Sequence, residues 1–397
     1  MNSTVYISRS VRNPIRDFGK ISRFVGVDGG DREEIYQHFV KTKREWMEEV
    51  HFSKKEFSAI LSEMKAYKLL DFEMRGKEIC LDEGGLRLFE LIKDKNLVGI
   101  RHHITSIFCE YHPQLITFLE KLLEKKVIVI PKPPGAREFK GRFTAYNSEH
   151  RKNYIDFCIG KIKELYQRLI KTSPSMLDDR MIDEMSGHIE VYVKNKVSDS
   201  DEGVNQKNVV KWTELAIKDF LIKKEFGNTF KSVPEFDVWL DRLFFLWLVN
   251  YSPSFPLFNG SIIYPTCTFK EPSDNQREYE HCVLSNGDSI FVNKPNWEGH
   301  RSKFAETLNT TYMKLNTLQG ISYIKIADIR DMVCYKLKIH DSTFDDFLKK
   351  SFRESNKGTF HLRISLDSDI YPGREHWKRS PLLLSKASGK RTIICIM

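Results

Sequence analysis

Apolar residues recur at steps of three and four through most of the chain, a spacing typical of amphipathic helices with one buried face. In the clearest run the apolar positions are Phe57, Ile60, Leu61, Met64 and Tyr67. Ser53 and Glu56 precede this run with the spacing of a capping box, so a helix is expected to begin there. Alternation with a period of two is confined to short stretches. The pattern therefore predicts a mainly α fold with small β elements (α+β).

The first hundred residues predict two helices followed by a β-hairpin and a third helix. Residues 1–30 read as an irregular arm, and Asp31 is expected to cap a helix running to about 50. After the helix that begins at Ser53, two short strands at 72–74 and 79–81 flank a turn at 75–77. A helix from 83 to 93 follows.

The last quarter repeats this order. Ile326, Ile329, Met332, Val333 and Leu337 lie on one face of a predicted helix. A second helix is expected from 341 to 350, after a short turn. Alternating apolar residues from 360 to 366 then predict a strand, with 392–396 as its partner and 375–391 as the connection.

Helix, turn, helix and a hairpin with a basic tip resemble the winged helix-turn-helix family, at both ends of the chain. The resemblance implies that the second helix enters a major groove and that the wing follows the phosphates. At the N-terminal end the cations expected to contact DNA are Lys54, Lys55, Lys65, Lys68, Arg75 and Lys77. At the C-terminal end they are Arg363, Arg374, Lys378, Arg379, Lys386, Lys390 and Arg391.

One feature of the C-terminal helix opposes this interpretation. The helix opens with Asp341, Asp345 and Asp346, and carboxylates are repelled by phosphate. Protein contact is therefore an alternative for that helix.

Between the two ends the chain predicts a helical, aromatic-rich middle domain, with its main core expected between 208 and 250. A proline cluster at 131–135 marks the clearest boundary. The expected division is an N-terminal arm and winged-helix-like domain at 1–98, a connector and linker at 99–147, the middle domain with a short β element at 148–295, and a C-terminal winged-helix-like domain at 296–397.

The linker combines basic and aromatic residues. Arg137, Lys140 and Arg142 alternate there with Phe139, Phe143 and Tyr146. Such a stretch could contact a nucleic-acid backbone and stack on bases, or its aromatics could pin a linker to the surface.

Charge favours a polyanionic partner. The 397 residues contain 63 Lys and Arg against 54 Asp and Glu, a formal net charge of +9. From Tyr323 onward there are 15 basic and 9 acidic residues, a net of 15 − 9 = +6. Most of the excess positive charge therefore lies at the C-terminal end. Such a charge asymmetry indicates a kind of partner and says nothing about the fold.

The remaining composition indicates a reduced, soluble context. The seven cysteines are scattered without a CxxC pair, so neither a disulfide framework nor a zinc ribbon is expected. No apolar run approaches the length of a signal peptide or of a membrane-spanning helix. A cytoplasmic location without membrane contact is expected.

Complete catalytic motifs are missing from the sequence. It lacks a Walker A motif, a GxSxG elbow and a dinucleotide fingerprint. His102, His103, Glu110 and His112 form the densest group of metal-capable residues, but without HExxH spacing. Cys109 and Cys334 read as core thiols. We therefore predict no catalytic residue, no metal and no cofactor.

The sequence thus predicts a non-catalytic protein that binds double-stranded DNA as part of a larger assembly. The alternative is an interaction subunit that resembles kleisin-like proteins and binds a protein partner such as an ATPase. An accessory component of an antiviral defence system is a variant of that alternative. Reversing the charge at Lys378, Arg379 and Lys390 together is expected to weaken duplex binding.

Overall fold

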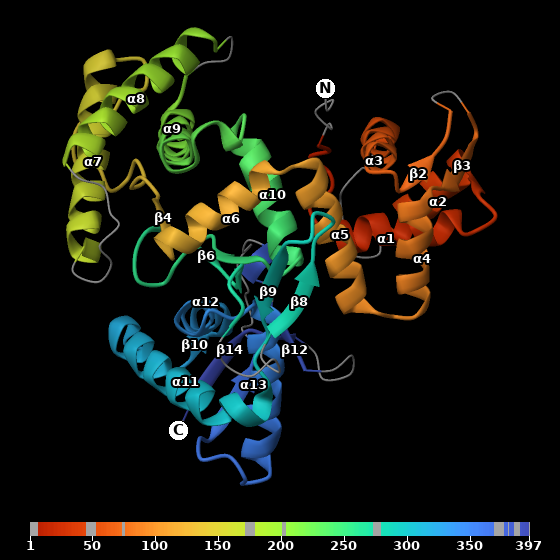
Figure 1. Ribbon diagram of the computed structural model, residues 1–397. Coiled ribbons are helices and arrows are strands. Elements are labelled where there is room, and N and C mark those ends of the chain that lie inside the picture. The colour runs from red at the N-terminus through yellow and green to blue at the C-terminus, as the bar shows by residue number, and fades with distance from the viewer. Residues whose placement is uncertain are drawn as a thin grey trace. The chain divides into compact units, whose positions relative to one another are not determined.

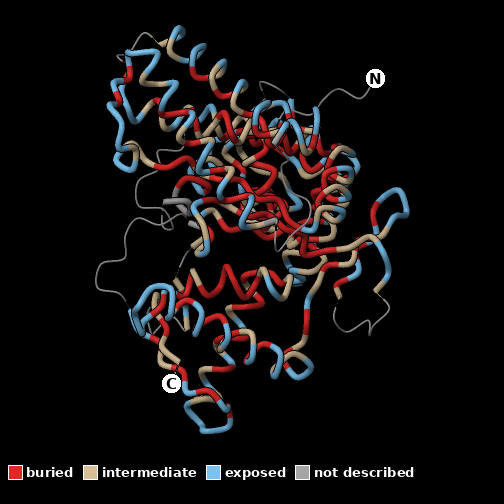
Figure 2. Tube along the Cα trace, turned by 90° about the vertical axis from the view of Figure 1, so that its left-hand side faces the viewer, coloured by how far each residue is buried: buried red, intermediate tan, exposed pale blue. Residues whose placement is uncertain are grey.

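The computed structural model is mainly helical with small antiparallel sheets, which confirms the fold class predicted from the sequence (Figure 1). It describes residues 7–44, 53–73, 76–170, 179–200, 204–272, 279–368, 377–379, 381–384 and 390–396. Buried and exposed segments alternate along its helices (Figure 2), as amphipathic spacing requires.

Contacts divide the chain into two compact units, each assembled from three separate segments. Unit 1 contains 1–119, 234–249 and 267–292, and unit 2 contains 120–233, 250–266 and 293–397. The sequence predicted four consecutive domains, and that division stays a prediction. Local sequence patterns do not show where a chain returns to an earlier unit.

Unit 1 begins with a module of three helices and three strands, here the N-terminal module. Its elements are α1 (Pro14–Val25), β1 (Gly30–Asp31), α2 (Arg32–Arg44), α3 (Lys54–Ala66), β2 (Leu70–Asp71) and β3 (Glu78–Leu81). The strands are antiparallel in the order β1-β3-β2. The capping box of Ser53 and Glu56 is present at the start of α3, as predicted.

The expectation of an irregular arm over residues 1–30 is wrong. Asn13 caps α1 by accepting a hydrogen bond from the Arg16 N–H at 3.0 Å, and Pro14 occupies the first turn, where proline is tolerated. The apolar face of α1 consists of Phe18, Ile21 and Val25, all buried. Basic residues between these positions concealed the helical spacing.

The rest of unit 1 surrounds this module with further helices and a small sheet. The helices are α4 (Glu83–Lys93), with the predicted bounds, α5 (Leu97–Tyr111), the first half of α6 (Gln114–Lys125) and nearly all of α10 (Val233–Phe245). The strands β7 (Cys267–Thr268), β8 (Tyr279–Val283) and β9 (Ser289–Asn293) form a sheet in the order β7-β9-β8.

Two buried ion pairs join distant segments of unit 1. Arg242 of α10 contacts Glu63 of α3 through two bonds of 2.6 and 3.0 Å, and neither side chain is exposed. Arg242 also donates to the carbonyl oxygens of Val11 and Ser8, which fixes the segment before α1. Arg101 of α5 pairs with Glu280 of β8 at 2.6 Å. Buried charges persist only when paired in this way.

Unit 2 combines three long helices with a small sheet. The helices are α7 (Ser148–Ile170), α8 (Asp179–Ser198) and α9 (Gln206–Phe226), followed by the 3-10 turn η1 (Gly227–Thr229). The strands β4 (Ile128–Pro131), β5 (Val249–Ser252) and β6 (Gly260–Pro265) pair in the order β4-β6-β5. The aromatic stretch 208–250 is not one core, because α9 belongs to unit 2 and α10 to unit 1.

The end of unit 2 forms a second module, here the C-terminal module. Its elements are α11 (Trp297–Gln319), β10 (Ile324–Lys325), α12 (Ile326–Leu337), α13 (Asp341–Asn356), β11 (Ile364–Asp367) and β14 (Ile393–Ile396). Its sheet has the order β10-β14-β11, and Ile364 pairs with Ile396 as the alternation predicted. Between β11 and β14 lie the 3-10 turn η3 (Trp377–Arg379) and the paired strands β12 (Leu382–Leu383) and β13 (Lys390–Arg391).

The two modules share one topology. With η3 and the separate β12-β13 pair of the C-terminal module set aside, each runs helix, strand, helix, helix, strand, strand, and in each the last strand lies between the other two. The first strand has only two residues in both modules and directly precedes the second helix.

Candidate functional site

The start of α3 is an exposed basic surface of the N-terminal module. Lys54 and Lys55 are exposed in the first turn. The Lys54 ammonium lies 2.8 Å from Glu33 of α2, and this hydrogen bond raises the pKa of Lys54. Both partners are more than half exposed, so water competes strongly for this contact.

A shallow depression of about 420 Å³ adjoins this helix start. It is formed by α2, α3 and the connection between β2 and β3, and its cations are Arg32, Lys54 and Lys77. The fold thus brings together two of the predicted residues. Arg32 was not predicted from the sequence as a contact residue, although it directly follows Asp31, which was expected to cap the helix.

The other predicted cations of this module lie elsewhere. Lys65 pairs with Asp71 at 3.0 Å and lies over the Phe72 ring. Lys68 is exposed and lines a different pocket. Arg75 lies outside the described residues.

In the C-terminal module, the acidic start of α13 is neutralised by cations of the same unit. Lys378 donates to Asp341, and Arg330 Nε donates to Asp345 Oδ1 at 2.8 Å. Burial alone would raise the pKa of Asp341, but Lys378 and Arg330 outweigh it and lower that pKa. Asp346 is the one exposed carboxylate of the three. The electrostatic objection to phosphate contact is therefore much weaker than the sequence suggests.

The same contacts change the interpretation of Lys378 and Arg379. Lys378 is 3% exposed, and Arg379 pairs with Asp331 at 2.7 Å and with Asp328. Both residues lie in η3, which folds back onto α12 and α13. They are internal counter-ions, so a charge reversal at these positions would disrupt the module rather than report on a wing.

The remaining predicted cations of this module are surface residues or lie outside the described residues. Arg363 and Lys390 are exposed, and Arg391 is partly exposed at 3.9 Å from Asp367. Arg374 and Lys386 fall outside the part of the chain that the structure describes.

The sequence analysis missed a cationic stripe on the second half of α13. Lys350 and Arg353 are exposed, and Lys349 is partly exposed beside them. The signal was available, because these positions lie off the buried stripe of Phe344, Phe347 and Leu348.

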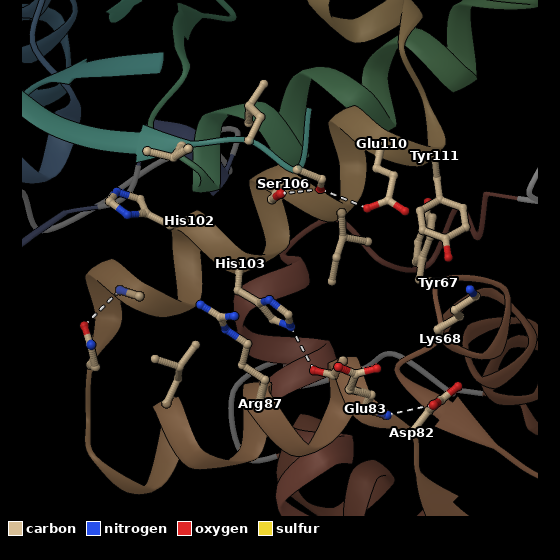
Figure 3. A pocket seen from close by; sticks show the side chains of 18 residues that line it. Tyr67, Lys68, Asp82, Glu83, Arg87, His102, His103, Ser106, Glu110 and Tyr111 are labelled. Carbon is tan, nitrogen blue, oxygen red and sulfur yellow. Dashed lines mark hydrogen bonds between the residues drawn. The ribbon is translucent and has the colours of Figure 1, made fainter. Parts of the chain in front are cut away.

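A pocket of about 620 Å³ lies in unit 1. His103 and Arg87 point into it from α5 and α4, and Glu110 and Tyr111 extend from further along α5 (Figure 3). His103 Nε2 lies 2.8 Å from the Gly84 carbonyl oxygen, so Nε2 carries the proton and Nδ1 is left as an acceptor. Burial lowers the pKa of His103, which favours this neutral form.

Two hydroxyl groups and a carboxylate of this pocket form a hydrogen-bonded chain. Ser285 Oγ donates to Glu110 at 2.9 Å and lies 2.8 Å from Ser106 Oγ (Figure 3). The lining contains two cations, Lys68 and Arg87, and three carboxylates, Asp82, Glu83 and Glu110. This mixture suits a small ligand that carries both a positive and a negative charge.

Metal-capable residues do not converge within the described ranges. No group of three His, Cys, Asp or Glu side chains there could hold a metal ion. His112 is buried, and it contacts the Tyr67 hydroxyl at 2.8 Å and the Trp239 ring. Burial lowers its pKa to about 4.

The cysteines behave as the sequence predicts. Cys109 and Cys334 are buried, and burial raises the pKa of the Cys109 thiol to about 12. A thiol with such a pKa remains protonated and is a poor nucleophile.

The described helices include none that is both long enough and apolar enough to cross a bilayer. Comparison with protein-family models, with curated proteins and with solved structures finds no match to this chain.

Proposed function

We propose that this protein binds double-stranded DNA through two winged-helix-like modules, one at each end of the chain. In this proposal α3 of the N-terminal module enters the major groove. The C-terminal module contacts the phosphate backbone with the second half of α13.

The shared topology of the two modules is the observation that carries this proposal. The order helix, strand, helix, helix, strand, strand, with the last strand central, occurs twice in one basic chain, and in the C-terminal module η3 and the β12-β13 pair are inserted before that last strand. In helix-turn-helix proteins the second helix of the pair reads the groove and its N-terminal residues contact the bases. Here those helices are α3 and α13.

The exposure of these two helix starts assigns different roles to the modules. Ser53, Lys54 and Lys55 are exposed at the start of α3. Asp341 and Thr343 are buried at the start of α13, where Lys378 and Asn250 contact the Asp341 carboxylate. A base-reading helix needs a free first turn, which favours α3 for the groove. α13 offers Lys350 and Arg353 instead, which suit phosphate contacts.

Fluorescence anisotropy with a labelled duplex, titrated at several salt concentrations, tests this proposal on the full chain. Lys55→Glu combined with Lys77→Glu is expected to weaken binding and to reduce the salt slope by about 2. Lys350→Glu combined with Arg353→Glu should reduce the salt slope by a similar amount. This variant should lose less discrimination between duplex sequences than the variant of Lys55 and Lys77.

The matched control is Lys207→Glu combined with Lys211→Glu, two exposed lysines on α9. Equal losses in all three double variants would mean that only net charge matters, and the modules would lose their assigned role. Absence of duplex binding at low salt would reject the proposal outright.

One observation favours the second candidate, a protein-interaction subunit. Four apolar side chains at the end of α11 and in the loop after it are about half exposed or more: Met313, Leu318, Ile321 and Tyr323. Exposed apolar side chains gathered in this way mark interaction surfaces more often than scattered ones do. Leu318→Glu combined with Ile321→Glu should then abolish capture of a protein partner while leaving duplex binding intact.

A further inference from the structure

The basic-aromatic segment 137–146 of unit 2 is held on α7 by its aromatic side chains. The Phe143 ring stacks on Tyr154 with centroids 4.6 Å apart and planes 13° apart. The Phe139 ring contacts Tyr154 and Phe157 at 5.9 and 5.4 Å. The linker is thus pinned to the surface, as one of the two sequence interpretations held.

Polar contacts fix the backbone of this segment as well. Arg151 Nη1 donates to the Ala145 carbonyl oxygen at 2.7 Å, and the Thr144 N–H donates to His150 Nδ1 at 3.2 Å. At Gly141 a Cβ atom would lie only 2.4 Å from the tip of the Phe139 ring, so glycine allows the ring to lie against the backbone here. The segment is therefore ordered before any partner binds, and binding would require little further loss of entropy.

The side chains between the pinned aromatics face solvent. Arg137, Lys140 and Arg142 are exposed, and none forms an ion pair with another described residue. Glu138, the one acidic residue of the segment, accepts a hydrogen bond from the Gly135 N–H at 2.8 Å. The segment therefore presents three cations against one anion, a net of 3 − 1 = +2.

Tyr146 completes this surface. Its side chain is 69% exposed, whereas Phe143 and Tyr154 nearby are buried. A tyrosine exposed to this extent offers an aromatic face without a partner in the described structure. Exposed cations and an exposed aromatic ring in one segment are the combination that single-stranded nucleic acid binding uses.

We propose that segment 137–146 binds single-stranded nucleic acid, with Arg137, Lys140 and Arg142 on the phosphates and a base stacked on Tyr146. An unpaired strand is favoured over a duplex because the bases of a duplex already stack on each other and leave no face for Tyr146. This surface shares no residue with the two modules, so the proposal does not depend on duplex binding.

The test is anisotropy of a short labelled oligo-deoxythymidine with the full chain, with oligo-uridine as a second probe. Tyr146→Ala should weaken binding about tenfold, since stacking contributes roughly 1–3 kcal/mol per base. Tyr146→Phe keeps the ring and should bind like the unmodified protein. Arg137→Ala, Lys140→Ala and Arg142→Ala together should reduce the salt slope by about 2.

The matched control removes three exposed lysines from α8 and α9 of the same unit: Lys194→Ala, Lys207→Ala and Lys211→Ala. It should leave oligonucleotide binding unchanged. Equal losses in the control and in the segment variant, or an unaffected Tyr146→Ala, would overturn the proposal. The proposal would also be overturned if the unmodified protein bound neither oligo-deoxythymidine nor oligo-uridine at low salt.

Duplex binding of the same variants separates this proposal from the proposed function. Normal duplex binding together with lost single-strand binding supports a separate site. If oligo-deoxythymidine binds more tightly than oligo-uridine, the strand is DNA, and the reverse order assigns RNA. Intact single-strand binding in all segment variants would reject only this proposal and leave the duplex proposal standing.

Discussion

Lys378 donates to Asp341, and through this contact a residue expected on a surface wing neutralises the first residue of α13. The Lys378 side chain is 1% exposed and that of Asp341 is 11% exposed. Part of the basic excess of the C-terminal module is therefore buried in ion pairs. The net charge of the module is larger than the positive charge that its surface presents to a polyanion.

Replacing Lys378 should destabilise the C-terminal module. Lys378→Met leaves Asp341 buried without its ammonium partner, and removing one member of a buried pair costs about 3–5 kcal/mol. Chemical denaturation checks the loss. Lys390→Met, which removes an exposed lysine of β13, is the control and should leave the denaturation midpoint unchanged. Equal midpoints for the two variants would show that the ion pair contributes nothing.

The pair between Arg242 and Glu63 should be equally sensitive in unit 1. Arg242→Met removes the cation that is paired with a fully buried carboxylate, so a loss of about 3–5 kcal/mol in unfolding free energy is expected. Lys54→Met removes the exposed partner of Glu33 and should not change stability measurably. A small effect of Arg242→Met would mean that water enters and solvates Glu63.

His112 should make unit 1 sensitive to acid. Burial lowers its pKa to about 4, whereas an unfolded histidine titrates near 6.5. Between these values the unfolded chain binds a proton that the folded chain does not, so stability falls as the pH falls from about 6.5 to 4. The loss should be on the order of 3 kcal/mol. Denaturation of a His112→Phe variant across this range should show a shallower pH dependence, and an unchanged slope would contradict the assignment.

Thiol reactivity should separate the seven cysteines into two groups. Cys80 is exposed and Cys395 partly exposed, so both should react with an aromatic disulfide reagent in the native protein. Five are buried and should react only after denaturation: Cys109, Cys158, Cys267, Cys282 and Cys334. Burial raises the pKa of four of them to about 12 and also raises the pKa of Cys334. Rapid reaction of more than two thiols in the native protein would show that its core opens.

Elements with strong local signals could be predicted from the sequence. The capping box predicted the start of α3, and the helix predicted from 83 to 93 has the bounds of α4. Elements with weak local signals were not predicted. An example is β1, which has only Gly30 and Asp31 and becomes a strand by pairing with β3. Two residues carry no alternation, so such a strand cannot be found before its partner is known.

Side-chain roles were harder to predict than elements. A basic residue looks the same in sequence whether it faces solvent, as Lys350 does, or a buried carboxylate, as Lys378 does. The difference arises from the return of the chain between β11 and β14, and no local pattern records it. Arg32 and Lys77 likewise line one depression only because β3 brings the hairpin back beside α2.

The discontinuity of unit 1 has a consequence for biosynthesis. Glu63 precedes Arg242 by 179 residues, so at about 5–20 residues per second the ribosome needs roughly 10–35 s to supply the missing cation. During that interval the nascent N-terminal module carries a carboxylate that the finished core buries, together with an unfixed segment before α1. A fragment ending before α10 would lack this cation permanently, and its N-terminal module would keep Glu63 without its ion-pair partner.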